Sequence, residues 1–176
     1  MDKPRDGSAN TAGREVVVTR TFDAPRELMW RLWTDPKHLT HWWGPHGFKT
    51  TVFEMDVRPG GIWKHTMHGP DGTGYPSECV FREVVPPKRV SYSLAGGSSD
   101  SPVQCEVTWV FEEQGRGTNV TLRMVFASSE ESERAEKLYG VKEGGVQTLE
   151  RFHEHFLKNT NLETAGSHLG AGKDRT

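Results

Sequence analysis

One histidine of the sequence stands among apolar residues at alternate positions. Trp63, His65 and Met67 are spaced two residues apart, so in a β-strand their side chains share one face. Phe53 and Met55 have the same spacing one predicted strand earlier. If this face is concave, His65 is a polar group in an apolar wall, which is typical of a site that orients a ligand through one or two hydrogen bonds. The alternative is a histidine that is satisfied within the core.

Other side chains have spacings that could bind a metal ion. Glu150, His153 and Glu154 have the i, i+3, i+4 spacing of metal ligands on a helix. On a helical wheel, however, Glu150 and Glu154 lie away from the apolar stripe, which favours a solvated charged face. Cys79 and Cys105 lie far apart without a CxxC or Cys/His spacing, which favours reduced core thiols. We therefore predict no metal site and no cofactor.

The residues for acid/base or nucleophilic catalysis are not arranged in a known motif. The sequence contains no GxSxG, HExxH, glycine-rich phosphate loop or kinase-like set. Glu54 and Asp56 alternate on one predicted strand and are expected to point outward. His65, Tyr92 and Glu106 are conceivable acid/base groups, but none has a visible partner. We predict no catalytic residue; whether the protein is an enzyme stays open, and a role in binding is favoured.

The composition is that of a chain rich in large aromatic side chains. Only 34% of the 176 residues are hydrophobic, yet 6 are Trp and 8 are Phe, which suits a chain that lines a cavity as well as filling a core. The 22 Lys and Arg against 24 Asp and Glu give a net charge of -2, which argues against nucleic acid as a partner. No apolar run approaches the roughly 18 residues of a membrane span, and no apolar signal segment opens the chain. We expect a cytoplasmic protein without membrane insertion.

The elements that position these residues begin with a strand and two short helices. The β-branched run 15–22 predicts the strand. A first helix opens after Asp23-Ala24-Pro25, and a second opens at Asp35-Pro36, because an acidic residue followed by proline is typical of a helix start.

Residues 48–126 are expected to form six antiparallel strands. Turn motifs at Pro59-Gly60-Gly61 and Gly69-Pro70-Asp71-Gly72 separate runs of alternating apolar and polar residues. A long helix is then predicted from Ser128, where Ser128 and Glu131 form a capping box, to about residue 158. Gly140 and the pair 144–145 are poor helix formers that indicate a kink or a break.

This order of elements predicts an α+β fold of the helix-grip type, in which a curved antiparallel sheet of six or seven strands surrounds the C-terminal helix. Residues 1–13 and 160–176 are polar, rich in small residues and without periodicity, so we predict disordered tails on both sides of one domain over residues 14–159. A curved sheet cannot close onto one helix everywhere. We therefore expect a pocket between them.

An ordered series of short motifs resembles one known family. The motifs are Phe22-Asp23-Ala24-Pro25, Trp33-Thr34-Asp35-Pro36, His41-Trp42-Trp43-Gly44-Pro45, Asp56-Val57-Arg58-Pro59-Gly60-Gly61 and Glu83-Val84-Val85-Pro86-Pro87-Lys88-Arg89. Over about residues 16–158 the chain resembles the heat-shock-protein ATPase activator-like family of the START-like (SRPBCC) superfamily. The resemblance implies the helix-grip fold. It also implies a fold that encloses a ligand cavity and does not define one reaction, since the superfamily includes lipid carriers, polyketide cyclases, hormone receptors and a co-chaperone domain.

We predict that a small hydrophobic or aromatic ligand binds in the pocket between the sheet and the C-terminal helix. Either Trp42 or Trp43 is expected to face this ligand, unless both pin the short helices to the sheet. Gly145 is expected to leave room under the helix. The predicted ligand-binding residues are Trp30, Trp33, Trp43, Met55, Trp63, His65, Trp109, Met124, Gly145, Leu149 and Phe152.

Two alternative functions follow from the same resemblance. The first is a polyketide cyclase-like or hydrolytic enzyme that uses the same cavity. The second is a co-chaperone-like regulator of a chaperone ATPase. Only about 13 residues precede the first predicted strand, whereas the eukaryotic co-chaperone carries a further N-terminal domain, so a chaperone partner is the least favoured. A homodimer is left open.

Overall fold

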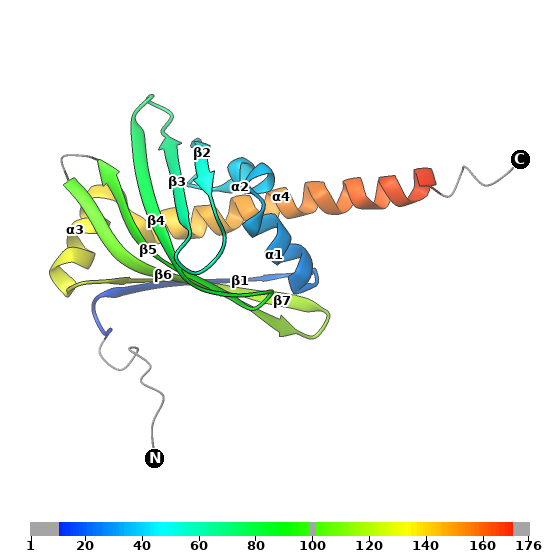
Figure 1. Cartoon of the computed structure of the whole chain (residues 1–176), viewed down its shortest axis with the longest axis horizontal. Helices are drawn as coiled ribbons and strands as arrows, with labels where there is room; N and C mark the ends of the chain where they lie inside the picture. The colour runs from blue at the N-terminus through cyan, green and yellow to red at the C-terminus, as the bar shows by residue number, and fades with distance from the viewer. Residues whose placement is uncertain (1–10, 99–100, 171–176) are drawn as a thin grey trace, which may run out of the picture.

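The computed structural model of this chain describes residues 11–98 and 101–170, and its curved sheet wraps around a long C-terminal helix (Figure 1). The described part forms one seven-stranded antiparallel sheet with the strand order β1-β7-β6-β5-β4-β3-β2. This arrangement confirms the predicted α+β helix-grip fold. The elements in chain order are β1 (Glu15–Phe22), α1 (Arg26–Thr34), α2 (Pro36–Trp42), β2 (Lys49–Met55), β3 (Ile62–His68), β4 (Gly74–Val85), β5 (Arg89–Ser98), β6 (Ser101–Gln114), β7 (Gly117–Phe126), α3 (Ser129–Tyr139) and α4 (Val141–Gly170).

The two short helices form where the sequence predicts them. Asp35 caps α2, because its Oδ1 accepts a hydrogen bond of 2.9 Å from the backbone N–H of Lys37, and Pro36 occupies the first turn. α1 presents four buried apolar side chains, which are Leu28, Met29, Leu32 and Trp33. The helices therefore cover one end of the concave face of the sheet.

The predicted long helix is divided into two. Ser128 caps α3 by accepting a hydrogen bond of 3.1 Å from the N–H of Glu131, as the capping box predicts. Gly140 ends α3 in the left-handed conformation, with φ 58° and ψ 51°, which a residue without a Cβ adopts at little cost. The predicted break therefore lies at Gly140, while Gly144 and Gly145 lie inside α4.

The helix α4 runs past its predicted end near residue 158 and continues to Gly170. No proline or glycine interrupts residues 146–165, so the backbone has no local reason to leave the helix there. Much of the tail predicted over residues 160–176 is thus helical, and residues 171–176 lie outside the described residues. Residues 1–10 of the other predicted tail also lie outside them. Thr11 is buried and donates a hydrogen bond of 2.9 Å to Glu15, so the folded unit begins before residue 14.

A β-bulge in the edge strand β2 changes which side chains face inward. The register pairs Val52 with His65 and Glu54 with Lys64, which leaves Phe53 opposite no residue. Phe53 is 69% exposed, so the prediction that it shares the inner face with Met55 is wrong. Alternation alone does not reveal a bulge, because one inserted residue reverses the facing of those on one side of it.

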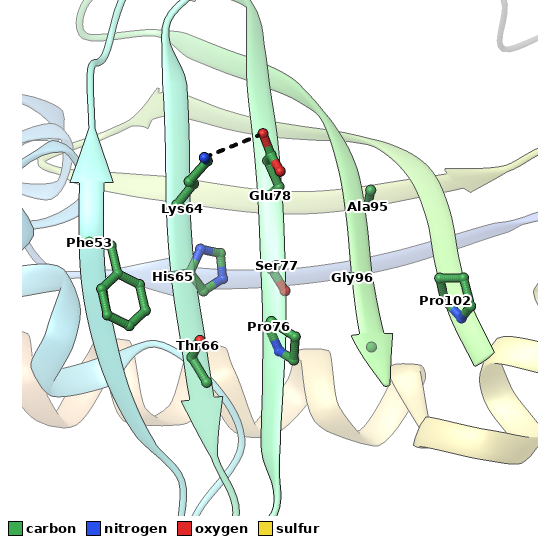
Figure 2. A pocket seen from close by; sticks show the side chains of 11 residues that line it. Phe53, Lys64, His65, Thr66, Pro76, Ser77, Glu78, Ala95, Gly96 and Pro102 are labelled. Carbon is green, nitrogen blue, oxygen red and sulfur yellow. Dashed lines mark ion pairs between the residues drawn. The ribbon is translucent and has the colours of Figure 1, made fainter. Parts of the chain in front are cut away.

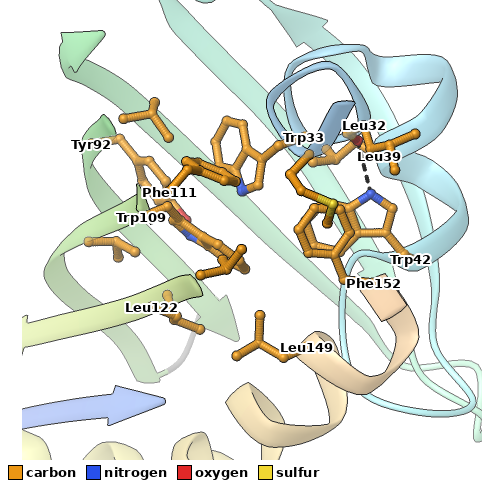
Figure 3. Packing of buried hydrophobic residues seen from close by; sticks show 14 of the residues in the cluster. Leu32, Trp33, Leu39, Trp42, Tyr92, Trp109, Phe111, Leu122, Leu149 and Phe152 are labelled. Atoms are coloured by element: carbon orange, nitrogen blue, oxygen red, sulfur yellow. Dashed lines mark hydrogen bonds between the residues drawn. The ribbon is translucent and has the colours of Figure 1, made fainter. Parts of the chain in front are cut away.

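The core is a cluster of aromatic rings between α1, α2, α4 and the sheet (Figure 3). Trp33 lies at its centre and is fully buried, with its ring centroid 5.5 to 6.3 Å from those of five other aromatic residues. Such pairs contribute about 0.5–1.5 kcal/mol each beyond the burial of their area. Cys79 and Cys105 are free and buried, as predicted, and burial raises the pKa of Cys105 to about 12. Among the described residues, no helix is long and apolar enough to cross a membrane.

Candidate functional site

A cavity of about 190 Å³ lies between the concave face of the sheet and the start of α4. We call it the inner chamber. Its wall is largely aromatic and aliphatic, and none of the described residues that line it is Asp, Glu, Lys or Arg. The lining residues are Trp43, Gly44, Pro45, His65, Met67, Ser77, Tyr92, Leu94, Val107, Trp109, Leu122, Met124, Tyr139, Val141, Gly144, Gly145 and Thr148.

A second hollow of about 240 Å³, the outer chamber, adjoins the inner one. The two share Pro45, Met67, Ser77, Leu94, Tyr139 and Val141. The outer chamber extends to the half-exposed Leu138 at the end of α3 and to Gly97 on β5. Together the two volumes fall in the range of small-molecule sites, which is about 300–1,000 Å³. The apolar periodicity of the sequence does not indicate the outer chamber. Tyr139 lines this chamber, and its position depends on how the chain turns at Gly140 between α3 and α4.

Five of the eleven predicted ligand-binding residues line the inner chamber. These five are Trp43, His65, Trp109, Met124 and Gly145. The other six lie elsewhere, and they are Trp30, Trp33, Met55, Trp63, Leu149 and Phe152. Most of these pack in the aromatic core, because α1 and α2 fill the end of the curved sheet that the sequence pattern leaves open.

The neighbouring tryptophans Trp42 and Trp43 have different roles. Trp42 is fully buried, stacks on Phe152 with ring centroids 4.1 Å apart, and donates a hydrogen bond of 3.0 Å from Nε1 to the carbonyl oxygen of Leu32 (Figure 3). Trp43 lines the inner chamber beside Trp109, with the two ring centroids 5.8 Å apart and tilted by 37°. Trp42 thus fixes α2 to the core, and Trp43 is the one that faces the cavity.

Arg151 holds the Trp43 segment against α4. Its Nη1 donates hydrogen bonds to the carbonyl oxygens of Trp43, Gly44 and Pro45 at 3.0, 3.0 and 3.1 Å. Its Nη2 donates to the carbonyl oxygen of His41 at 3.2 Å. Burial lowers the pKa of Arg151. A flat guanidinium can satisfy several carbonyls at once, so this side chain determines where the wall of the chamber lies.

Gly145 lies on the face of α4 that is turned toward the sheet. A Cβ on it would lie 3.1 Å from Cγ2 of Val18 and 3.6 Å from Cδ2 of Leu122. The missing side chain therefore allows the helix to approach the sheet closely here, and Gly145 also lines the inner chamber.

His65 is the one histidine among the described residues that line the inner chamber. It is 2% exposed, and its ring stacks on Trp63 with centroids 4.3 Å apart at 26°. Burial lowers the pKa of His65 to about 3, so the imidazole is neutral at physiological pH. Its Nδ1 is buried and has no hydrogen-bond partner among the described residues. Ser77 lies directly opposite it on β4 (Figure 2).

Tyr92 and Trp109 form a polar contact within the wall. Nε1 of Trp109 donates a hydrogen bond of 3.2 Å to the hydroxyl of Tyr92, and burial raises the pKa of Tyr92 well above its usual value. The tyrosine therefore stays protonated. Glu106, the third conceivable acid/base group, accepts a hydrogen bond of 2.7 Å from Ser93 in an exposed position outside the chamber. The structure thus places His65 and Tyr92 in the wall of the same chamber and leaves Glu106 outside it.

The residues with metal-like spacing are also separated. Glu150 pairs with His46 at 2.9 Å on the surface, while the ring of His153 packs on Phe22 with centroids 5.7 Å apart. Within the described ranges, no group of three or more His, Cys, Asp and Glu is placed to hold a metal ion.

A hollow of about 420 Å³ lies over strands β2 to β6, where Phe53 stands on β2 (Figure 2). Lys64 and Glu78 line it and form an ion pair at 3.9 Å. It differs from the inner chamber in having charged side chains in its lining, so it is the weaker candidate for an apolar ligand.

Comparisons with known proteins identify relatives over nearly the whole domain. Residues 23–156 match the family model of the Activator of Hsp90 ATPase homolog 1-like protein. The solved structure of protein Ms6760 from Mycobacterium smegmatis is 27% identical, with a TM-score of 0.73, over 82% of this chain and 91% of that chain. A protein from Arthrobacter aurescens is 23% identical, with a TM-score of 0.78, over 85% and 89%. The AHSA1 protein from Silicibacter pomeroyi is 20% identical, with a TM-score of 0.68, over 82% and 99%. The last two likenesses concern the fold alone, and no curated protein matches the sequence.

Proposed function

This chain belongs to the activator of Hsp90 ATPase homolog 1-like family, and from that premise we propose that it binds a small hydrophobic or aromatic ligand in the inner chamber. The observation that carries the proposal is a cavity with an apolar wall and few polar groups, placed between sheet and helix. The rings of Trp43 and Trp109 offer two aromatic surfaces to the ligand.

The size of the chamber limits the affinity. A ligand of one or two rings that buries about 250 Å² of apolar surface gains roughly 6 kcal/mol from burial. Stacking adds to this gain, and lost freedom on association subtracts from it. We expect dissociation constants on the order of 10–100 μM for simple aromatic compounds.

The enzymatic alternative, a cyclase-like or hydrolytic activity in the same cavity, has less support. Acid/base catalysis needs a group whose pKa lies near the working pH. Among the described wall residues there is no carboxylate, and the pKa of His65 at about 3 makes it a weak base. The co-chaperone alternative would use an outer surface and gives the inner chamber no role. Ligand binding is the function that uses the cavity as it is built.

A tryptophan-fluorescence titration with a panel of aromatic, lipid and polyketide compounds tests the proposal. We expect saturable quenching by at least one aromatic compound. Trp43→Phe should reduce this signal and leave the part that comes from Trp109, because both indoles line the chamber. The matched variant Trp30→Phe changes a residue outside the wall and should keep the signal. Absence of a saturable response from every compound would contradict the proposed function.

A further inference from the structure

We propose that the inner chamber selects uncharged ligands that carry a hydroxyl group, and that His65 and Ser77 receive this hydroxyl. The inference rests on the proposed function, and it adds the chemical class of the ligand. Three properties of the chamber support it, namely its charge, its unpaired polar atom and the rigidity of the ring that carries this atom.

The first property is the lack of charge. No Asp, Glu, Lys or Arg is found among the described residues that line the inner or the outer chamber. His65 is neutral at physiological pH, and Tyr92 keeps its proton. A buried carboxylate or ammonium group of a ligand would therefore have no counter-charge, and burial of an unpaired ion is strongly unfavourable. The chamber discriminates against ionised ligands.

The second property is one buried atom without a partner. Nδ1 of His65 forms no hydrogen bond with any described residue, although buried polar atoms in proteins are nearly always paired. His65 lines the inner chamber, so a small shift of the neighbouring side chains brings a ligand group to this atom, and a bond formed there removes the penalty of leaving it unpaired. A hydroxyl both donates and accepts, so it can pair with Nδ1 in either neutral tautomer of the imidazole. A carbonyl or an ether oxygen can only accept.

The third property is the fixed position of the imidazole. Its ring stacks on Trp63 and meets the ring of Trp43 edge-on, with centroids 5.7 Å apart at 84°. Ser77 stands opposite it in the register, and Gly96 stands opposite Ser77. A Cβ at Gly96 would lie 2.6 Å from the Ser77 Oγ, so the glycine leaves the hydroxyl its space. The two polar side chains are thus adjacent before a ligand arrives, which lowers the entropic cost of binding.

Three probes of similar shape test the inference by calorimetric titration at neutral pH: naphthalene, 2-naphthol and 2-naphthoate. We expect 2-naphthol to bind about fivefold more tightly than naphthalene, as one net hydrogen bond allows. We expect 2-naphthoate to bind at least about 50-fold more weakly than 2-naphthol, because its charge finds no partner. In the variant His65→Phe, which keeps the ring but lacks the nitrogens, 2-naphthol and naphthalene should bind within about twofold of each other.

Two further variants separate this role of His65 from a structural one. Ser77→Ala should reduce the preference for 2-naphthol, while His68→Phe, an exposed histidine on the same strand, should leave it unchanged. The affinity for naphthalene reports whether each variant still folds around its chamber. Equal affinities of the native chain for naphthalene and 2-naphthol, a preference for 2-naphthoate, or an unchanged preference in His65→Phe would each overturn the inference but not the proposed function. Failure of all three probes to bind would also overturn the inference, whereas the proposed function is contradicted only when the whole compound panel gives no saturable response.

Discussion

At the scale of single residues, His65 shows how a polar group is retained in an apolar wall. Its neighbours are the rings of Trp63 and Trp43. The stacking holds the ring in place, and burial keeps it uncharged. The alternation of apolar residues around His65 is sufficient to predict that its side chain lies on the inner face of a strand. It could not indicate that Nδ1 lacks a partner, since this depends on side chains from other strands.

The burial of His65 has a consequence for stability against pH. The pKa of this histidine falls from 6.5 to about 3 on folding, so between these values the unfolded chain binds more protons than the folded chain. The stability that His65 contributes is therefore present above pH 6.5 and is lost as pH falls toward 3. In His65→Phe, the loss of unfolding free energy between pH 6.5 and 4 should be smaller by about 3 kcal/mol.

Urea unfolding of the native chain and of His65→Phe at pH 7, 5 and 4 measures this difference. The variant His68→Phe controls for the removal of a histidine as such, because His68 is exposed. Parallel pH profiles for the native chain and His65→Phe would contradict the prediction.

At the scale of elements, the sequence predicts the order of strands and helices well, since alternation, proline and capping residues act locally. The first strand, the two short helices and the cap at Ser128 are examples. Two features depend on non-local packing and were not predictable in this way, namely the bulge at Phe53 and the depth of Trp33 in the core. For the same reason, six of the predicted wall residues pack outside the chamber.

The contact between α4 and the Trp43 segment depends on Arg151, which has four backbone carbonyls as acceptors. Arg151→Lys should lower the unfolding free energy by about 2 kcal/mol, because an ammonium cannot reach all four in one plane. It should also weaken the binding of naphthalene, because Trp43 loses its fixed position. Thermal unfolding and a titration with naphthalene measure the two effects.

A matched control is Lys142→Gln on the exposed side of the same helix, which should change stability by less than about 0.5 kcal/mol. If Arg151→Lys behaves like this control in both measurements, the segment is held by other contacts, such as the hydrogen bond from Thr50 to the carbonyl oxygen of Trp43.

At the scale of the whole molecule, the fold separates two tasks. The aromatic cluster under α1 and α2 stabilises one end of the sheet, and the chambers occupy the other end, where α3 and α4 meet at Gly140. The packed aromatic core at one end of the sheet stabilises the fold. The side chains around the chambers at the other end therefore do not have to pack tightly against one another. This arrangement is compatible with a cavity that exchanges its contents.

The chambers are assembled from the sheet, the Trp43 segment and α4, so they exist only in the folded chain. A ligand that binds the folded state alone raises its stability by mass action, and 2-naphthol at ten times its dissociation constant should add about 1.4 kcal/mol. For a domain of this size the midpoint of thermal unfolding should rise by about 3–5 °C.

This shift can be measured by thermal unfolding followed by circular dichroism. Three samples are compared: the protein with 2-naphthol, the protein with the same concentration of 2-naphthoate, and the protein without a ligand. We expect the full shift with 2-naphthol, about half of it in His65→Phe because the affinity falls about fivefold, and almost none with 2-naphthoate. An equal rise with both compounds would contradict the inference that the chambers, whose described lining residues include no Asp, Glu, Lys or Arg, discriminate against a charged ligand.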